Sequence, residues 1–247
     1  MKKGKIYAVG IGPGAREHRT QRAVDAIRES TGIVGYKTYI PFIEDLIEAQ
    51  EVHPLGMKHE VERCEKALDL ALEGETVSLI SSGDPGIYAM AGIMFEVMEK
   101  KGALDNVDLE VVPGVTASSA AAASLGAPIM HDHVSISLSD LLTPWSLIEK
   151  RLDLAAQGDF VISLYNPKSK GRPKHLQRAV EILCKHRRKD TPVGIVIKAK
   201  RQGERVKITT LEALPLEEVN MFTLVLIGNS NTKILGDFLV TPRGYSL

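Results

Sequence analysis

The chain has 247 residues, of which 44% are hydrophobic and 25% are charged, a composition typical of a globular protein that can bury a substantial core. Its 31 Lys and Arg residues balance its 31 Asp and Glu residues, which argues against a general nucleic-acid-binding protein. No apolar run approaches the roughly 20 residues that a membrane span needs, and the chain starts with a short strand rather than a signal-peptide apolar region. We therefore expect a cytoplasmic enzyme or binding protein without a nucleic-acid or membrane partner.

Cys64 and Cys184 are the only cysteines. They lie on separate predicted helices and form no CxxC pair, so they suit a reducing compartment and not a disulfide framework. We expect both to be small residues of the hydrophobic core.

The first half of the chain alternates between predicted strands and predicted helices. Short apolar runs predict the strands, and apolar side chains at helical spacing predict the helices. We expect Val61, Cys64, Leu68 and Leu72 to face the core from one helix, and Phe95 from the next. The strands are expected at 5–9, 33–36, 76–80 and 109–112, and the helices at 21–29, 42–49, 60–72 and 89–100. Such alternation predicts a mostly parallel sheet with helices on both faces.

From about residue 118 the pattern is richer in neighbouring strands. A run of Ala and Ser predicts a helix of small residues, which either packs closely against another backbone or is simply a good helix former. Helices are expected at 117–124, 147–155 and 175–185, and strands at 134–138, 160–164, 193–197, 206–209 and 223–227. The third and fourth of these strands are expected to pair with each other across 201–204. The sequence thus predicts two α/β domains, 1–117 and 118–247, with a mostly parallel sheet in the first, a mixed sheet in the second and a cofactor cleft between them.

A turn of unusual composition, Gly83-Asp84-Pro85-Gly86, follows the buried strand at 76–80 and precedes a helix. Open α/β sheets bind ligands in the crevice at the carboxyl ends of their strands. The two glycines let a ligand approach the backbone, and Pro85 stiffens the turn. The alternative is a strand–helix turn in which Asp84 or a preceding serine only caps the following helix.

A second turn, from Gly10 to Gly14, follows the first strand. With Ala15 it satisfies the G-x-G-x-x-A pattern of dinucleotide-binding sites. Pro13, however, removes a backbone N–H from the loop that would hold a pyrophosphate. The second strand is followed by Lys37 and not by an acidic residue that could hold a ribose, so the turn is weak evidence for a nicotinamide cofactor.

A third turn, Pro113-Gly114, closes the strand at 109–112 and opens the small-residue helix. Thr116 can cap that helix or contact a ligand. Three Gly/Pro turns at the strand ends of one sheet are more than capping alone accounts for, and together they predict one crevice.

His131, Asp132 and His133 precede a predicted strand on which Ser135, Ser137 and Ser139 share one face. A zinc-type site needs a further ligand, which the sequence does not place nearby, so we predict no metal site. A polar loop is the first interpretation, and an acid–base role for one histidine is the second.

Asn166-Pro167 and two clusters of basic residues follow the predicted strands at 160–164 and 193–197. These basic residues suit either a solvated surface or a substrate with several carboxylates; they are Lys168, Lys170 and Arg172, and Lys198, Lys200 and Arg201. No G-x-S-x-G elbow, P-loop, HExxH or kinase signature occurs, so hydrolase and phosphotransferase functions have little support.

Taken together, residues 9–14, 82–88, 112–119 and 197–200 resemble the tetrapyrrole methyltransferase family in order and spacing. Residues 131–145, 164–169 and 227–230 are similar to the branch of that family that acts on precorrin-3B or cobalt-factor III. The resemblance covers essentially the whole chain. The segment Ala15-Arg16-Glu17-His18 departs from the family pattern, in which Asp-Pro often follows Gly-Pro-Gly.

The resemblance implies an S-adenosylmethionine-dependent methyltransferase, usually a homodimer, that yields S-adenosylhomocysteine. It further implies methylation of carbon 17 of the macrocycle with ring contraction, in cobalamin biosynthesis. Carried over residue by residue, the cofactor contacts are Pro13, Gly83, Asp84, Ile87, Thr116, Ala117, Asn166 and Ala199.

The implied chemistry needs mainly positioning, because the methyl donor is already activated. Ring contraction also needs proton transfers, for which we predict acid–base or orienting roles for His131, Asp132, His133 and Asp140. Candidates for binding the substrate carboxylates are Lys37, Lys198 and Arg201.

Two alternatives remain open at the level of the sequence. One is a methyltransferase of the same fold that acts at another macrocycle carbon, or on RNA or protein. The other is a non-catalytic nucleotide-binding module, which the lack of any recognisable effector segment disfavours.

Overall fold

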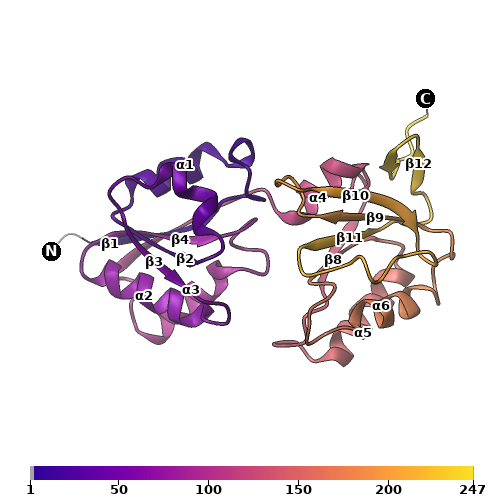
Figure 1. Cartoon of the computed structure of the whole chain (residues 1–247). Helices are drawn as coiled ribbons and strands as arrows, with labels where there is room; N and C mark the ends of the chain where they lie inside the picture. The colour runs from indigo at the N-terminus through magenta and orange to yellow at the C-terminus, as the bar shows by residue number, and fades with distance from the viewer. Residues whose placement is uncertain (1–2, 247) are drawn as a thin grey trace. The chain divides into compact units, whose positions relative to one another are not determined.

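The computed structural model describes residues 3–246 (Figure 1). The chain forms two compact units, one ending at Thr116 and one starting at Ala117. Each unit is built around a five-stranded sheet with helices on both faces, so the predicted pair of α/β domains is confirmed. Within the described range, no helix combines the length and apolar character needed to cross a bilayer.

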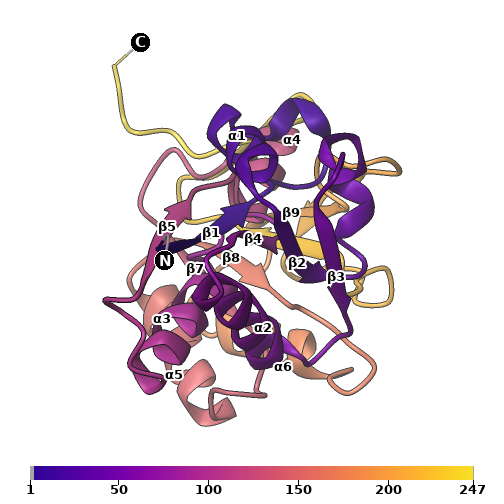
Figure 2. The same ribbon diagram turned by 90° about the vertical axis from the view of Figure 1, so that its left-hand side faces the viewer.

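The sheet of the first unit has the order β3-β2-β4-β1-β5, and all of its strands are parallel. Helix α1 lies on one face and helices α2 and α3 lie on the other (Figures 1 and 2). The strands are β1 (Gly4–Gly10), β2 (Gly32–Tyr36), β3 (Glu51–Leu55), β4 (Thr76–Ser81) and β5 (Val107–Val112). The helices are η1 (Arg16–His18), α1 (Gln21–Glu29), η2 (Ile40–Leu46), α2 (Glu60–Leu72) and α3 (Met90–Lys100).

The alternation of side chains along these strands builds two cores, one on each face. Val9 and Ile80 pack with α1 and η2, whereas Ile6 and Leu79 pack with α2 and α3. Because both faces of the sheet are covered, its central strands β1 and β4 are buried almost throughout.

The sheet of the second unit has the order β10-β9-β11-β8-β7 and is mixed, because β7 and β8 are parallel and the other pairs are antiparallel. Its strands are β7 (His133–Ser137), β8 (Val161–Tyr165), β9 (Pro192–Ile197), β10 (Arg205–Thr210) and β11 (Thr223–Ile227). The predicted pairing of β9 with β10 is confirmed. A small sheet of β12 (Lys233–Leu235), β13 (Phe238–Val240) and β6 (Gly126–Ala127) completes the unit.

Helix α4 (Ala117–Leu125) covers one face of this second sheet, and α5 (Trp145–Gln157) and α6 (His175–Leu183) cover the other. Ala121 and Ala122 of α4 pack against Val196 of β9 and Leu224 of β11. The approach is close, since a Cβ at Gly194 would overlap the side chain of Leu125. The alanines of α4 thus pack against the sheet, as the sequence predicted, while the larger Leu125 fits because it faces a glycine of β9.

Some predicted elements differ from the structure. The helix expected at 42–49 is the short helix η2, and the edge strand β3 that follows it was not predicted. Val61, Leu72 and Phe95 were expected in the core but are exposed. The buried stripe of α2 follows Cys64, Ala67, Leu68 and Ala71 at the spacing i, i+3, i+4, i+7, so alanines take the core positions that larger apolar residues were expected to occupy.

The two cysteines are unpaired. Cys64 is buried among the core residues of α2, where burial raises the pKa of its thiol to about 12. Cys184 is partly buried against the core of the second unit. Cys64 is therefore the core residue that the sequence predicted, whereas Cys184 lies at the margin of the core.

Candidate active site

Three turns meet at the carboxyl ends of β4, β1 and β5, which are neighbours in the first sheet. Gly12 and Gly83 form an isolated antiparallel bridge, with N–O distances of 3.1 Å from Gly12 N and 2.7 Å from Gly83 N. The third turn lies equally close, because a Cβ at Gly114 would be 2.6 Å from Gly10 O and closer still to Gly83 O. Since only glycine permits such an approach of backbones, the three turns form one packed cluster, which we call the turn cluster.

Asp84 joins the turns of this cluster to one another. Its Oδ1 accepts a hydrogen bond of 2.8 Å from Gly86 N in its own turn. Its Oδ2 accepts one of 3.1 Å from Gly114 N in the turn that follows β5. Because both oxygens are engaged by backbone N–H groups, the side chain orients the loops rather than capping α3.

The other predicted cofactor residues of the first unit flank the turn cluster. Pro13 is buried directly after the Gly12 bridge, and Thr116 is partly buried after the third turn. Ile87 exposes its side chain beside Asp84, and the next residue, Tyr88, has a left-handed φ of 53°. Left-handed backbone in a non-glycine residue is costly and occurs preferentially at ligand sites. The structure thus places all five predicted residues of this unit on or next to the turn cluster.

The segment after Gly14, where the sequence departs from the family pattern, is held by a buried arginine. The Arg19 side chain is 3% exposed and donates to both oxygens of Asp45, at 2.9 and 3.0 Å, and to the carbonyl of Phe42. The Arg19 guanidinium keeps the pKa of Asp45 below its usual range. Thr20 caps α1 and donates to Pro113 O at 3.3 Å. Sequence reasoning missed this clamp, since no local spacing connects Arg19 with Asp45.

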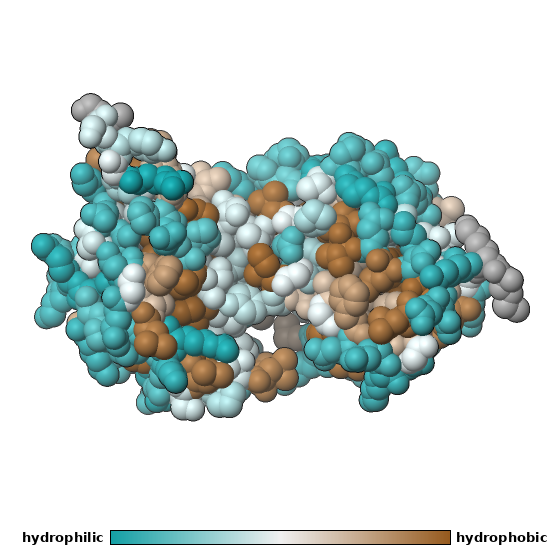
Figure 3. Space-filling model, turned by 180° about the vertical axis from the view of Figure 1, so that it is seen from behind, coloured by the Kyte–Doolittle hydropathy of each residue, from teal (hydrophilic) through white to brown (hydrophobic). Residues whose placement is uncertain are grey.

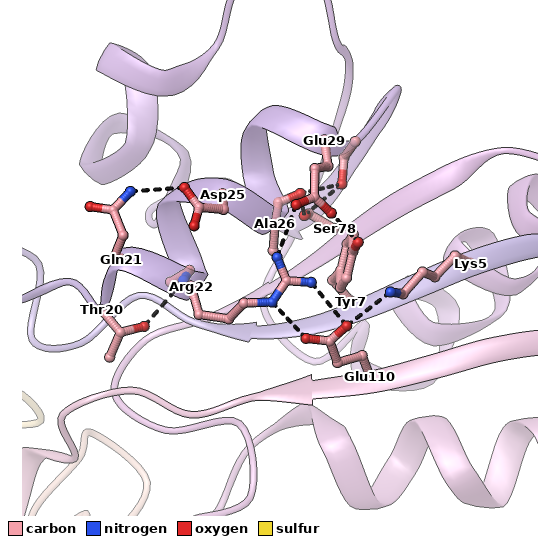
Figure 4. A network of polar contacts seen from close by, with 12 residues as sticks. Lys5, Tyr7, Thr20, Gln21, Arg22, Asp25, Ala26, Glu29, Ser78 and Glu110 are labelled. Carbon is pink, nitrogen blue, oxygen red and sulfur yellow. Dashed lines mark hydrogen bonds and ion pairs between the residues drawn. The ribbon is translucent and has the colours of Figure 1, made fainter.

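A polar network lies behind the third turn, where α1 packs on β1 and β5 (Figure 4). Glu110 of β5 accepts hydrogen bonds from Arg22 at 2.7 and 2.9 Å and from Lys5 at 2.9 Å. Tyr7 donates to Glu29 and lies beneath both cations, whose charged groups are 4.3 and 4.8 Å from its ring centroid. The network joins β5 to α1 and so supports the strand that carries Pro113-Gly114.

The network predicts an acid-sensitive contribution to stability. Hydrogen bonds from Arg22 and then Lys5 lower the pKa of Glu110 to about 2 from 4.5. A carboxylate whose pKa is lowered in the folded state stabilises the fold. This stabilisation is complete when the pH is above the pKa in the unfolded state, and it is lost as the pH falls from about 4.5 towards about 2. We expect Glu110→Gln to lower stability near neutral pH and to flatten its decline below about pH 5, measured by urea unfolding at several pH values. Glu96→Gln, at an exposed position of α3, is the control, and an equally steep decline in Glu110→Gln would contradict the prediction.

In the second unit, β7, β8 and β9 run in the same direction, so their carboxyl ends share one edge of the sheet. Asn166 follows β8 with a left-handed φ of 51°, and its Nδ2 donates to Ser137 Oγ at the end of β7 at 2.9 Å. Ala199 follows β9 between Lys198 and Lys200, whose φ values are 54° and 53°. Backbone strain is thus concentrated at the two strand ends that the cofactor prediction singled out.

Ala117 belongs to the same part of the second unit. Together with Ala199 and Tyr165 it packs against the cluster between α4 and the sheet. Ser118 N, in the first turn of α4, donates to the Tyr165 hydroxyl at 2.9 Å. The structure therefore brings Ala117, Asn166 and Ala199 to one edge of the second sheet.

His131, Asp132 and His133 lie at the other end of β7. Val161 N, at the start of β8, donates to Asp132 O at 3.1 Å, and all three predicted side chains are exposed. They line a shallow hollow of about 370 Å³ together with Ile129, Met130 and Arg243. His133 begins β7 and Ser137 ends it, so these two residues lie about 13 Å apart at the usual rise per residue. No group of His, Cys, Asp and Glu in residues 3–246 is arranged to hold a metal ion.

Asp140, by contrast, lies beyond the carboxyl end of β7, and it has a partner that the sequence did not predict. His175 Nε2, at the start of α6, is 3.0 Å from Asp140 Oδ2, and His175 keeps the pKa of that carboxyl below its usual range. The imidazole packs edge-on against Trp145, with ring centroids 4.4 Å apart. The four predicted catalytic residues are therefore divided between two edges of the sheet, and Asp140 alone shares an edge with Asn166.

The sequence of residues 5–215 matches the family described as Tetrapyrrole (Corrin/Porphyrin) Methylases. The chain belongs to this family. The turn cluster of this tetrapyrrole methylase lies within the matched residues, as do the strand ends that carry Asn166 and Ala199.

Relatives of this tetrapyrrole methylase align with nearly its whole length, in sequence and in structure. It is 50% identical over 245 residues to "Cobalt-factor III methyltransferase" of Priestia megaterium, with 98% of this chain but 45% of that protein covered. It is 47% identical to "Probable cobalt-factor III C(17)-methyltransferase" of Salmonella typhimurium, with 98% of this chain and 100% of that protein covered. The crystal structure of the methyltransferase CobJ superposes with a TM-score of 0.91 at 37% identity, covering 97% of this chain and 100% of that chain.

Proposed function

We propose that this tetrapyrrole methylase transfers a methyl group from S-adenosylmethionine to carbon 17 of cobalt-factor III or precorrin-3B, with ring contraction, in cobalamin biosynthesis. The observation that carries the proposal is the 47% identity along the full length of the Salmonella typhimurium relative. Both relatives described above are named for cobalt-factor III, which favours the cobalt-containing substrate. A homodimeric state and a cytoplasmic location remain predictions.

The residues of the turn cluster suit S-adenosylmethionine. Glycine-rich turns at the ends of three neighbouring strands carry no side chains that would block a ligand at the place where α/β sheets bind ligands. Exposed Ile87 offers an apolar contact beside the Asp84 carboxylate. We propose cofactor contacts from Pro13, Gly83, Asp84, Ile87 and Thr116 in the first unit and from Ala117, Asn166 and Ala199 in the second.

The protein's contribution to methyl transfer is positioning. When bound, S-adenosylmethionine supplies an activated methyl group on its sulfonium. Asp84 fixes the turns through Gly86 and Gly114, so the backbone groups that face the cofactor need not be ordered at each turnover. Asp140, held by His175, is the predicted acid–base or orienting group that lies on the same edge as Asn166. Roles for His131, Asp132 and His133 stay predictions, and their position at the opposite edge makes Asp140 the first residue to test.

Incubation of the purified chain with methyl-labelled S-adenosylmethionine and either cobalt-factor III or precorrin-3B tests the proposal. We expect the label to enter the tetrapyrrole, with a product mass that reports one added methyl group and an absorption spectrum that reports ring contraction. Uroporphyrinogen III is the matched control substrate, since a methylase of another specificity would label it. Transfer to this control, or to neither proposed substrate, would overturn the proposal.

A further inference from the structure

The loop between β7 and α5 presents two leucines to solvent. Leu141 is 69% exposed and Leu142 is 96% exposed. Both ends of the loop are fixed, because Asp140 pairs with His175 and Trp145 packs on the same imidazole. Figure 3 shows that apolar side chains reach the surface in several places, but this pair stands on an anchored loop at the edge that carries Asn166. An apolar ligand that covers the pair would gain the free energy of removing it from water.

Arg172 lies at the base of this loop and lacks an ion pair among the described residues. Its Nη1 donates to Ser139 Oγ at 2.6 Å, whereas its Nε is buried without a hydrogen-bond partner. Asp140 is near enough for the charge of Arg172 to contribute to its lowered pKa, but its hydrogen bond is made with His175. The Nε of the buried Arg19 also lacks a hydrogen-bond partner, but the guanidinium groups of Arg19 and Arg63 are each paired with a carboxylate, whereas that of Arg172 is not. Arg172 therefore has unused capacity for an acidic group.

A chain of hydrogen bonds connects Arg172 with the proposed cofactor residue Asn166. Ser137 Oγ accepts from Asn166 Nδ2 at 2.9 Å and from Ser139 N at 3.2 Å, and Ser139 Oγ accepts from Arg172. The guanidinium and the two leucines thus belong to the strand ends at which the second unit is proposed to contact the cofactor. A substrate that receives the methyl group must lie beside that position.

We propose that Arg172 binds one peripheral carboxylate of the tetrapyrrole, and that Leu141 and Leu142 lie against the adjacent part of the macrocycle. The inference rests on the proposed function, because it names the groups with which the second unit recognises that substrate. A guanidinium presents parallel N–H donors that match the two oxygens of a carboxylate. The leucines match the apolar ring, and together they distinguish a carboxylated macrocycle from an apolar or an amidated one.

The test compares two corrins that differ in their side chains. Cobyrinic acid carries free carboxylates, whereas cobinamide carries amides. Binding is followed by quenching of the fluorescence of Trp145, the only tryptophan of the chain, which adjoins this loop. We expect Arg172→Gln to weaken binding of cobyrinic acid about 10-fold or more, as loss of a charge-assisted hydrogen bond predicts, and to leave cobinamide binding unchanged. Leu142→Ser is expected to weaken both corrins alike.

Arg188→Gln is the matched control for charge. Arg188 is exposed, pairs with Asp190 and precedes β9 at the opposite edge of the sheet, so we expect its replacement to change neither affinity. Arg172→Lys keeps the positive charge but loses the paired N–H donors of the guanidinium. We expect its affinity for cobyrinic acid to lie between those of the wild type and Arg172→Gln. This variant also tests the inference if Arg172→Gln folds poorly. The inference would be overturned if Arg172→Gln weakened the binding of both corrins equally or weakened the binding of neither. It would also be overturned if the wild type did not bind cobyrinic acid.

The outcome separates this inference from the proposed function. If cobalt-factor III is methylated but Arg172→Gln binds cobyrinic acid as wild type does, only the carboxylate site is wrong. If Arg172→Gln selectively loses cobyrinic acid while neither proposed substrate is methylated, the site stands and the proposed reaction is wrong.

Discussion

Replacing Gly114 with alanine is expected to destabilise the first unit by about 2 kcal/mol and to abolish measurable binding of S-adenosylhomocysteine. The added Cβ would lie 2.6 Å from Gly10 O and closer still to Gly83 O. Both obstacles are backbone atoms of neighbouring turns, so no side-chain rotation can relieve the overlap. The turns would have to move apart, which also breaks the hydrogen bond from Gly114 N to Asp84. Urea unfolding and calorimetric titration with S-adenosylhomocysteine measure the two effects.

Gly92 provides the matched control for this substitution. It lies within α3, and a Cβ at this position would meet no atom within 4 Å. Gly92→Ala is therefore expected to raise stability by up to about 1 kcal/mol through helix propensity alone. If Gly114→Ala bound S-adenosylhomocysteine as tightly as wild type, close approach of the three turns would not be what forms the site.

Replacing Asp84 with alanine is expected to weaken binding of S-adenosylhomocysteine by about 10- to 100-fold, because the turns that Asp84 joins would then have to be ordered on binding, at a cost of up to about that of one charge-assisted hydrogen bond, about 1.5–3 kcal/mol. The variant leaves the N–H groups of Gly86 and Gly114 without the acceptor that joins their turns. Asp84→Asn keeps one oxygen and is expected to bind with intermediate affinity. Calorimetric titration measures the affinities.

Two other results would contradict the predicted role of Asp84 in cofactor binding. If Asp84→Ala lowered the midpoint of urea unfolding but bound S-adenosylhomocysteine within about two-fold of wild type, its role would be stability alone. Tighter binding by Asp84→Asn than by wild type would show instead that the negative charge opposes the cofactor.

The sequence predicted most of the fold because most of the apolar residues that recur at helix or strand spacing are the residues buried in the core. In α1 and α2 the predicted and observed bounds are the same, since each helix lies between clear turn signals. The three turns of the turn cluster were also recognisable from composition, because the close approach of the turns requires glycines and because Asp84 joins two of the turns by hydrogen bonds. How closely Gly10, Gly83 and Gly114 approach one another was not predictable, because it depends on the register of β1, β4 and β5.

What sequence reasoning missed has two physical causes. Strand β3 and the hairpin of β12 and β13 are short and largely exposed, and their apolar runs are too short to predict a strand. Contacts such as Arg19 with Asp45, or Asp140 with His175, join residues far apart along the chain, and no periodicity reports them. For the same reason, His131 and Asp140 could not be assigned to different edges of the sheet before the direction of β7 was known.

The polar network around Glu110 has a consequence for how the protein behaves in a crowded solution. β5 is the outermost strand of its sheet, and an unpaired strand edge is a template onto which another chain can add. Here the strand carries charges along its length, because Asp108 pairs with Lys3 and Glu110 with Lys5 and Arg22. A strand that paired with β5 would have to displace water from these ion pairs, which costs free energy. We therefore expect the residues that support the third turn to disfavour the addition of another strand to β5 as well.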